Sequence, residues 1–446
     1  MTLAPVFRRV PPATLLLGLA LGLLSESCRP AAVRVVLVTL DTLRYDSLAG
    51  DAATASLMPL TLARGLKGRF FERAFAATSC TQPTHATLFT GLHPWQHGVT
   101  SNGRVLEGRY ETVAEVLTEN GFETAAVVAS LPVSGRFGFA QGFRTFREPF
   151  TLGFGSDEWE GTKVEGARFY ALGGTVTDEA LRLLDSARSR RQFLWVHYFD
   201  PHAPYGDAAP GAVALTPADV IRRIRSGGAE AAGLSAEVRD LYGRDVGSLD
   251  AALDRLLARL EHDASRIETH VVVTADHGES LGEGQVIGHG NHLTPEQVHV
   301  PLFILSPRLA SGRDSRPTGS IDLGPTLLAL AGVKASMPGG CDLTTAARPR
   351  CLTVGMRRTY DRPTEAWRAD GTRETLSGPL FYLADEAGRL HVGNGAGPLG
   401  APADEAWARG LGRLFRSFEA RLAGRPAGGP MDPETERALH ALGYVP

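Results

Sequence analysis

Residues Val33–Leu40 read VRVVLVTL, and Asp41 follows directly after them. A run that is this apolar and this rich in β-branched residues is typical of a parallel strand buried on both faces of a sheet. Segments with the apolar spacing of helices separate it from further apolar runs at 124–129, 193–198, 270–274 and 300–305. Strands that alternate with helices predict an α/β fold, in which a mainly parallel sheet is sandwiched between helices.

The pattern of apolar residues changes near residue 340. Two short apolar stretches at 380–383 and 389–392 flank a turn-forming segment and predict a β-hairpin. Residues 405–423 have the spacing of a helix. We therefore expect a large α/β domain over residues 33–340 and a smaller α+β subdomain over residues 341–446.

The composition limits the class of protein. With 446 residues, of which 43% are hydrophobic and 21% are charged, the chain can bury a large core. These values exclude disorder, collagen, a coiled coil and a polytopic membrane protein. The 46 basic and 49 acidic residues nearly balance, so the charge gives no sign of a nucleic-acid partner.

The first 28 residues predict a signal peptide. Arg8 and Arg9 precede an apolar stretch at 13–24 that is too short for a membrane-spanning helix. Cys28 follows, as at the lipidation site of a bacterial lipoprotein, although Glu26 is a poor match to that pattern. The segment predicts export to the periplasm or a lipid anchor in a bacterial membrane, with ordinary secretion or an uncleaved anchor as alternatives.

Three cysteines follow this leader. Cys341 and Cys351 enclose a short loop and are expected to form a disulfide in an oxidising compartment, which leaves Cys80 as a free thiol. Because no pair has Cys-x-x-Cys spacing, a zinc ribbon or a redox dithiol is not expected.

Ionisable residues follow three of the predicted strands at the point where each strand ends. The carboxyl ends of parallel strands meet at one edge of a sheet, where open α/β folds bind their ligands. Carboxylates and an imidazole there suit a divalent cation, although an Asp after a strand is more commonly a turn or helix cap. The residues concerned are Asp41, then Asp200 with His202, then Asp276 with His277.

A hydroxyl group lies at the start of a predicted helix within residues 79–91, SCTQPTHATLFTG. Pro83 is typical of the first helical turn, so Thr81 lies at the positive end of the helix dipole. A hydroxyl there suits a nucleophile that attacks a phosphate or sulfate, because the developing negative charge is stabilised where it forms. Taken alone, Thr81 is better explained as a helix N-cap.

Taken together, the motifs resemble the sulfatase family of the alkaline phosphatase superfamily. The matching stretches follow the order of the family, cover residues 33–333, and include TQPTHATLFTGLHPWQHGV at 81–99, FLWVHYFDPHAPY at 193–205 and VVVTADHGESLGEG at 271–284. The resemblance implies an alkaline-phosphatase-like fold, a sulfatase-like catalytic domain over 33–340 and a metal-dependent hydrolase of ester bonds.

The resemblance also assigns residues to the site. It implies a divalent cation, calcium first with magnesium, manganese or zinc as alternatives, whose ligands are Asp41, Asp276, His277 and Thr81. The nucleophile position, two residues before the motif proline, is held by Thr81. His202 falls where the family often has a substrate-contacting histidine, His289 falls where it often has a basic residue, and His85 is a third catalytic candidate.

Several positions depart from the family pattern. Typical members have Cys or Ser at the nucleophile position, where it is oxidised to formylglycine, and Thr81 cannot form that group. His85 replaces an arginine, and Thr42 replaces the second Asp of the usual pair. The segment 127–137 lacks the usual lysine. Contacts to an anion must therefore come from the metal, histidines and arginines.

These observations favour an exported, metal-dependent hydrolase that cleaves sulfate or phosphate esters through a covalent intermediate on Thr81. One alternative is a phosphoryl or phospho-headgroup transferase with the same nucleophile. Another is a catalytically degenerate, membrane-tethered binding protein. The substrate expected is a small molecule, or an ester of a glycan or lipid, and the sequence does not identify it further.

The leader generates a first prediction. If Cys28 carries a lipid, the Cys28→Ala variant loses the anchor and moves from the membrane fraction to the soluble fraction after cell fractionation. A variant that stayed unprocessed and membrane-bound to the same extent as the unsubstituted protein would instead indicate an uncleaved apolar anchor.

Overall fold

The computed structural model describes residues 32–50, 55–150, 169–208, 214–227, 231, 233–345, 353–357, 364–399 and 405–423. The predicted signal peptide with Cys28, and the predicted disulfide partner Cys351, lie outside these residues. Cys341 is disulfide-bonded, whereas Cys80 is buried and forms no disulfide. Within the described residues, no helix combines the length and the apolar character needed to cross a membrane.

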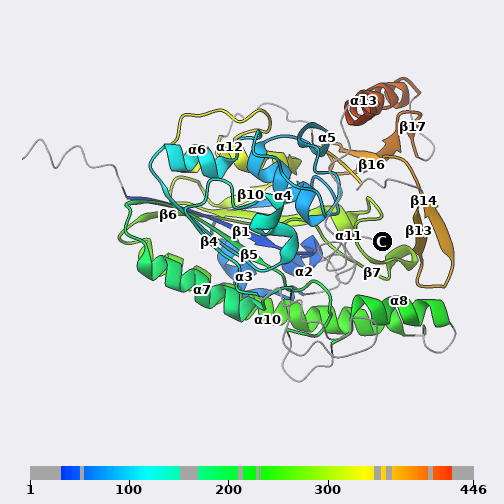
Figure 1. The fold of residues 1–446 in the computed structure, drawn as a ribbon, viewed down its shortest axis with the longest axis horizontal. Helices are drawn as coiled ribbons and strands as arrows, with labels where there is room; N and C mark the ends of the chain where they lie inside the picture. The colour runs from blue at the N-terminus through cyan, green and yellow to red at the C-terminus, as the bar shows by residue number, and fades with distance from the viewer. Residues whose placement is uncertain are drawn as a thin grey trace, which may run out of the picture.

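One large sheet forms the middle layer of the molecule (Figure 1). Its strands follow the order β10-β2-β9-β6-β1-β5-β3-β4, and β11 pairs with β2. The block from β6 to β4 is parallel throughout. The bounds of the strands are β1 Val33–Leu40, β2 Arg69–Phe75, β3 Glu123–Val128, β4 Thr145–Arg147, β5 Arg191–Tyr198, β6 Glu268–Ala275, β9 His299–Leu305, β10 Gly312–Asp314 and β11 Thr318–Gly319.

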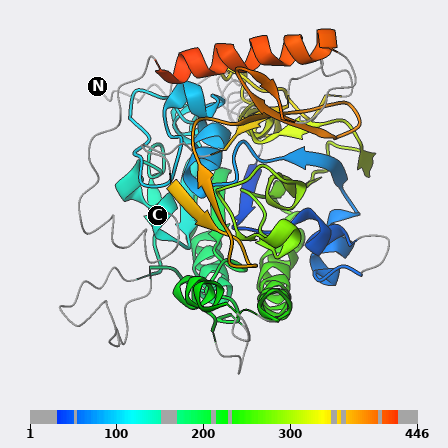
Figure 2. The same cartoon turned by 90° about the vertical axis from the view of Figure 1, so that its right-hand side faces the viewer.

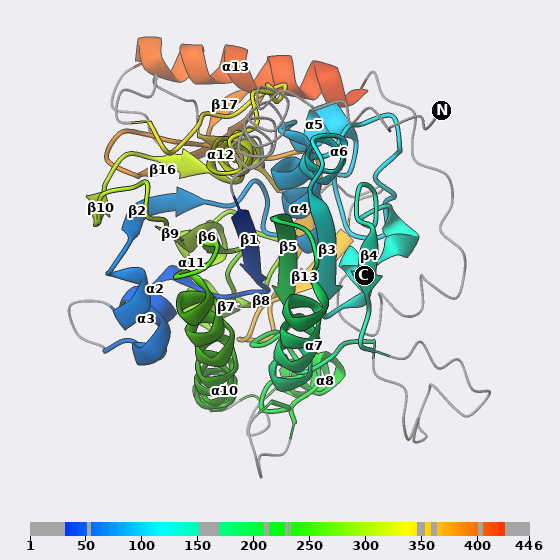
Figure 3. The ribbon, with the colours of Figure 1, turned by 90° about the vertical axis from the view of Figure 1, so that its left-hand side faces the viewer.

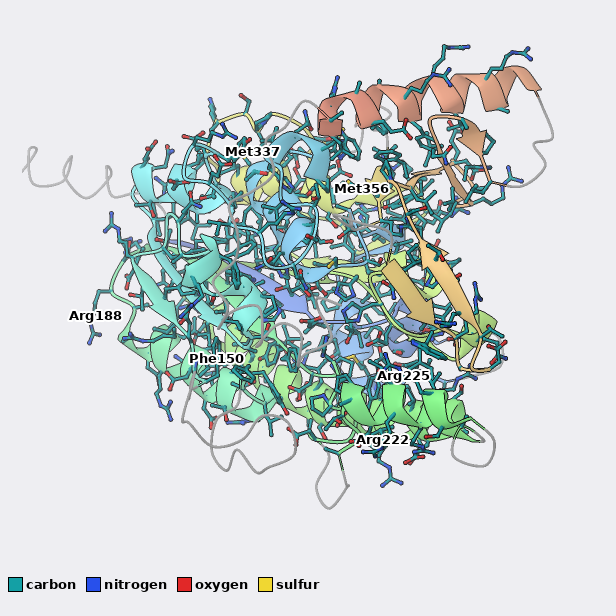
Figure 4. The ribbon with its side chains drawn as sticks, turned by 45° about the vertical axis from the view of Figure 1, so that its right-hand side comes forward. Phe150, Arg188, Arg222, Arg225, Met337 and Met356 are labelled. Atoms are coloured by element: carbon teal, nitrogen blue, oxygen red, sulfur yellow. The ribbon has the colours of Figure 1, made fainter. Side chains whose placement is uncertain are left out.

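Helices cover both faces of this sheet, as Figure 3 shows end-on. One layer contains α2 (Tyr45–Ala49), α3 (Pro59–Gly65), α7 (Gly173–Ser186) and α10 (Leu234–Asp263), with α8 (Pro217–Ser226) beyond them. The other contains α4 (Thr81–Thr90), α5 (Pro94–His97), α6 (Val113–Glu119) and α12 (Leu323–Leu330). Side chains fill the space between the layers, whereas arginines such as Arg188 and Arg222 project outward (Figure 4).

The predicted α/β fold is therefore confirmed, and the physical reason lies in burial. Every residue of β1 is buried, because helices lie against both faces of the strand. The sheet differs from the expectation at one side, where β9 runs antiparallel to β6 and β2 runs antiparallel to β9. Strand β2 was not predicted, because its sequence RFFERAF carries three charged residues that suit its partly exposed position.

The C-terminal part forms a second, antiparallel sheet, as the hairpin signal predicts. Its order is β12-β15-β16-β17, with bounds Val354–Met356, Phe381–Ala384, Leu390–Asn394 and Gly397–Pro398. Helix α13 spans Glu405–Ala423 and packs Phe418 against Trp95 of α5, with ring centroids 4.1 Å apart. Figure 2 shows α13 lying along the top of the molecule. A separate hairpin is formed by β13 (Thr364–Trp367) and β14 (Arg373–Leu376).

Buried carboxyl groups hold the loop after β5 against the helices. Asp200 accepts a hydrogen bond from the Gly173 backbone N–H at the start of α7, over 2.6 Å. Asp245 of α10 accepts from the backbone N–H groups of Gly206 and Ala208, over 2.5 and 3.0 Å. Burial, and then the carboxylate of Asp245, raise the pKa of Asp200 to about 7. The loop that carries His202 is thus fixed at both of its ends.

The raised pKa generates a prediction about stability. Asp200 ionises more easily in the unfolded chain than in the folded protein, so the free energy of unfolding falls as the pH rises from about 4 to about 7. The Asp200→Asn variant cannot ionise, and its amide oxygen can still accept from Gly173. We expect it to lose less stability than the unsubstituted protein between about pH 5 and pH 8, by up to about 3 kcal/mol.

Denaturant unfolding at the two pH values measures this difference. The matched control is Asp240→Asn, because Asp240 lies on the exposed side of α10 and pairs with Arg244. Parallel stability profiles of Asp200→Asn and the unsubstituted protein would contradict the prediction.

Candidate active site

Two predicted cation ligands follow neighbouring strands that end in register. Leu40, the last residue of β1, pairs with Tyr198 of β5 on one side and with Ala275 of β6 on the other. Asp41 and Asp276 therefore leave the sheet at the same level, and both are fully buried. The ligating atoms of Asp41, Asp276 and His277 all lie within 4.8 Å of one another. The structure thus brings together the three residues that the sequence assigned to one cation.

His277 is oriented as a metal ligand. Its Nδ1 lies 2.9 Å from the backbone oxygen of Gly278, which can only accept, so the ring proton is on Nδ1. The lone pair on Nε2 then faces Asp41 Oδ1 and Asp276 Oδ2, each 3.7 Å away. Metal-binding histidines typically donate their other N–H to a carbonyl or carboxylate in this way.

The electrostatics of the site also fit a cation. Burial lowers the pKa of His277 to about 4, so its imidazole is neutral near pH 7. Burial likewise raises the pKa of Asp276 to about 6, although nearby His85 and hydrogen bonds from the backbone N–H groups of His277 and Thr42 act in the opposite direction. Within the described residues, Asp276 Oδ2 has no hydrogen-bond partner. Buried carboxylates are normally paired or bound to metal, so these side chains fit a divalent cation.

The candidate nucleophile lies at the edge of this cluster. Helix α4 begins at Thr81 itself, with Cys80 as its N-cap residue, one residue earlier than the position of Pro83 suggested. The Thr81 hydroxyl lies 3.3 Å from His277 Nε2. All ten residues of α4 are buried. Thr81 therefore combines contact with a cation ligand and the positive end of a helix dipole.

His85 contacts the backbone of Thr81 and not its hydroxyl group. Its Nδ1 donates to the backbone oxygen of Thr81 over 2.9 Å, and its Nε2 accepts from the Thr39 hydroxyl over 3.1 Å. The Thr39 oxygen in turn accepts from the indole N–H of Trp195 over 3.0 Å. Burial lowers the pKa of His85. Because both ring nitrogens are engaged, His85 is placed to support Thr81 and not to contact a substrate.

The other two predicted histidines line the opposite side of His277. The ring centroid of His289 lies 4.4 Å from that of His277 and 5.1 Å from that of His202. His202 Nδ1 donates to the backbone oxygen of Ala203, and His289 Nδ1 donates to Glu279. Burial lowers the pKa of His202 to about 3, so this ring is neutral.

Sequence reasoning missed three polar residues around the site. Thr39 and His197 are register partners on β1 and β5, and Glu279 is a buried carboxyl that holds His289. A signal for His197 existed, since it is the single histidine in the otherwise apolar and aromatic run 193–198. A polar side chain inside a doubly covered strand requires a partner.

The chain also matches known proteins in sequence and in fold. The family model described as Sulfatase matches residues 34–333. An uncharacterised sulfatase of Escherichia coli, YdeN, is 24% identical over 311 residues, which cover 60% of this chain and 52% of that protein. The chain therefore spans about half the length of this relative.

Solved structures share the fold at low sequence identity. A 2-O GAG sulfatase superposes with a TM-score of 0.65 and 17% identity, over 91% of this chain and 96% of that one. A phosphonate monoester hydrolase from Silicibacter pomeroyi gives a TM-score of 0.60 and 19% identity, over 88% and 96%. Since the family model matches well over half of the chain, the protein belongs to the sulfatase family.

Proposed function

We propose that the protein is an exported, metal-dependent hydrolase of sulfate or phosphate esters, with Thr81 as its nucleophile. The observation that carries the proposal is the 3.3 Å approach of the Thr81 hydroxyl to His277 Nε2 at the start of a buried helix. The structural neighbours include a GAG sulfatase and a phosphonate monoester hydrolase, and their activities support both sulfur and phosphorus as the atom attacked.

Asp41, Asp276, His277 and Thr81 are the residues that would hold the cation. Bound there, a divalent cation supplies Lewis acidity, which polarises the ester oxygens and favours the alkoxide form of Thr81. The family resemblance implies calcium, which prefers six to eight oxygen ligands. This donor set instead contains an imidazole, and Thr42 stands where the family usually has a further aspartate. We therefore propose manganese or zinc as the working ion.

The residues of the chain divide the reaction between them. After losing its proton to water, the Thr81 oxygen attacks sulfur or phosphorus in line, the bond to the leaving oxygen breaks, and the sulfate or phosphate ester on Thr81 is later hydrolysed by water. His289 is the better proton donor to the leaving oxygen, because a proton on its Nε2 places the positive charge of the ring beside Glu279. His202 is neutral and donates through Nδ1 to Ala203, so its Nε2 is suited to accept a hydrogen bond or a proton.

The threonine favours a second candidate function, a transferase. An ester on Thr81 lacks the neighbouring hydroxyl that a formylglycine hydrate uses to expel sulfate, so its release depends on an incoming acceptor. If that acceptor is an alcohol instead of water, the enzyme transfers the group. Product analysis with an added alcohol distinguishes the two, since hydrolysis yields inorganic sulfate or phosphate and transfer yields a new ester.

The nucleophile generates a matched pair of predictions. Thr81→Ala removes the attacking oxygen and should lower turnover by roughly three orders of magnitude or more, whereas Thr81→Ser should retain activity. Cys80→Ala should retain most activity, because Cys80 is the extended N-cap residue and Thr81 is the first residue of the helix, so that their side chains project in different directions. Turnover is measured on an aryl sulfate, a phosphate monoester and a phosphodiester.

Circular dichroism and metal content would show that each variant is folded and loaded. The opposite pattern, in which Cys80→Ala abolishes turnover, would contradict the assignment of Thr81. So would a peptide mass that corresponds to formylglycine at Cys80.

The cation site generates a separate prediction that does not depend on turnover. The purified protein should contain one divalent ion per chain, and Asp276→Asn should lose it, because the substitution removes a buried anionic ligand while keeping the shape of the side chain. Elemental analysis after dialysis measures the content. Asp178→Asn, on the exposed surface of α7, is the control.

Equal metal content in Asp276→Asn and the control would contradict the ligand assignment. If the unsubstituted protein binds no ion even when manganese, zinc, calcium or magnesium is added, the degenerate binding protein becomes the better explanation.

A further inference from the structure

His197 is a buried histidine that the proposed reaction does not use. It lies on β5 and pairs with Thr39 of β1, and it is fully buried. Its Nδ1 lies 3.3 Å from the backbone N–H of Ala129, which follows β3 and can only donate. Nδ1 therefore accepts, and the ring proton is on Nε2. The backbone at the end of β3 thus fixes the tautomer of His197.

The Nε2–H group of His197 faces a predicted cation ligand. Nε2 lies 3.7 Å from Asp41 Oδ2, while the other oxygen of the same carboxylate, Oδ1, faces His277. A movement of less than about 1 Å would shorten the first distance to the roughly 2.9 Å that is usual for a hydrogen bond. The two oxygens of Asp41 thus have different neighbours: Oδ2 faces the N–H group of His197, and Oδ1 faces the nitrogen lone pair of His277.

We propose that His197 is a positioning residue for Asp41. Its Nε2–H holds Oδ2, which fixes the carboxylate plane and leaves Oδ1 directed at the cation. This proposal rests on the cation site proposed above and extends it to a residue that does not touch the cation. Partners that orient a ligand in this way commonly change metal affinity by about 10- to 100-fold when they are removed.

A different role for His197 has to be considered, because His85, His197 and Asp276 also place three ligating atoms within 4.8 Å of one another. The hydrogen bonds argue against a second cation there. His197 presents a proton and not a lone pair, and both nitrogens of His85 are engaged, with Thr81 and with Thr39. A metal ligand must offer a lone pair.

Two substitutions at His197 separate these roles. Glutamine can place an amide N–H near the position of Nε2 and so can still reach Asp41. Asparagine is shorter: it can accept from Ala129 near the position of Nδ1 but cannot reach Asp41. Both change the packing, so a purely structural role would affect them similarly.

The experiment titrates manganese or zinc into metal-free protein in competition with a chelating dye, and follows thermal unfolding of the same samples. We expect one ion per chain, a Kd raised about 10- to 100-fold in His197→Asn, and a Kd within a few-fold of the unsubstituted value in His197→Gln. Equal affinities of His197→Asn and the unsubstituted protein would overturn the proposal. Two ions in the unsubstituted protein, one of them lost in both variants, would overturn it in favour of a ligand role.

A measurement on the unsubstituted protein covers the case in which His197→Asn does not fold. With ¹⁵N-labelled histidine, NMR should show a proton on Nε2 of His197 before and after zinc is added, whereas His277 should show one on Nδ1. Loss of the His197 Nε2 proton on zinc binding would contradict the proposal. If the unsubstituted protein binds no cation at all, it is the proposed function that fails, and this outcome is distinct from an unchanged affinity in His197→Asn.

Discussion

The rest of the site depends on two carboxyl groups that are buried beside each other. Asp41 and Asp276 follow neighbouring strands that end in register, and the imidazoles of His85, His197 and His277 lie within 3.8 Å of their oxygens. Burial keeps these rings neutral by lowering their pKa values. Negative charge held in a poorly solvated place without a positive neighbour costs several kcal/mol. A divalent cation at the proposed site would offset that cost.

Neutral histidines take the place of charged side chains around this centre. Typical members of the family carry an arginine four residues after the nucleophile and a lysine near the next strand, and here His85 and the segment 127–137 depart from both. A neutral imidazole has one nitrogen that donates a hydrogen bond and one that accepts. The backbone group that each ring contacts determines which nitrogen carries the proton. Carbonyls orient His85, His202 and His277, whereas an N–H orients His197. In this chain, therefore, the backbone sets which ring nitrogen of each neutral histidine donates and which accepts, at positions where typical members of the family have a positive charge.

Local signals in the sequence were enough to predict the parallel core and the convergence of Asp41, Asp276 and His277. A strand that is buried on both faces has a nearly continuous apolar sequence, which distinguishes it from a surface strand. The carboxyl ends of parallel strands lie at the same edge of the sheet. The direction of β9 and the existence of β2 could not be predicted, because antiparallel pairing at a sheet edge depends on partners far apart in the sequence. The roles of His197 and Glu279 were also hidden, since each depends on the register that brings its partner within reach.

The packing of α13 has a consequence for how the molecule acquires its final form. Trp95 follows the nucleophile helix by a few residues, yet its apolar cover comes from Phe381, Phe415 and Phe418, far downstream in the chain. Contacts between such distant segments form slowly, because the intervening loop must close before they stabilise anything. We therefore expect the surroundings of α4 to be completed late in folding, when the C-terminal sheet and α13 dock onto α5. Until then Trp95 is an exposed aromatic surface that a chaperone can recognise.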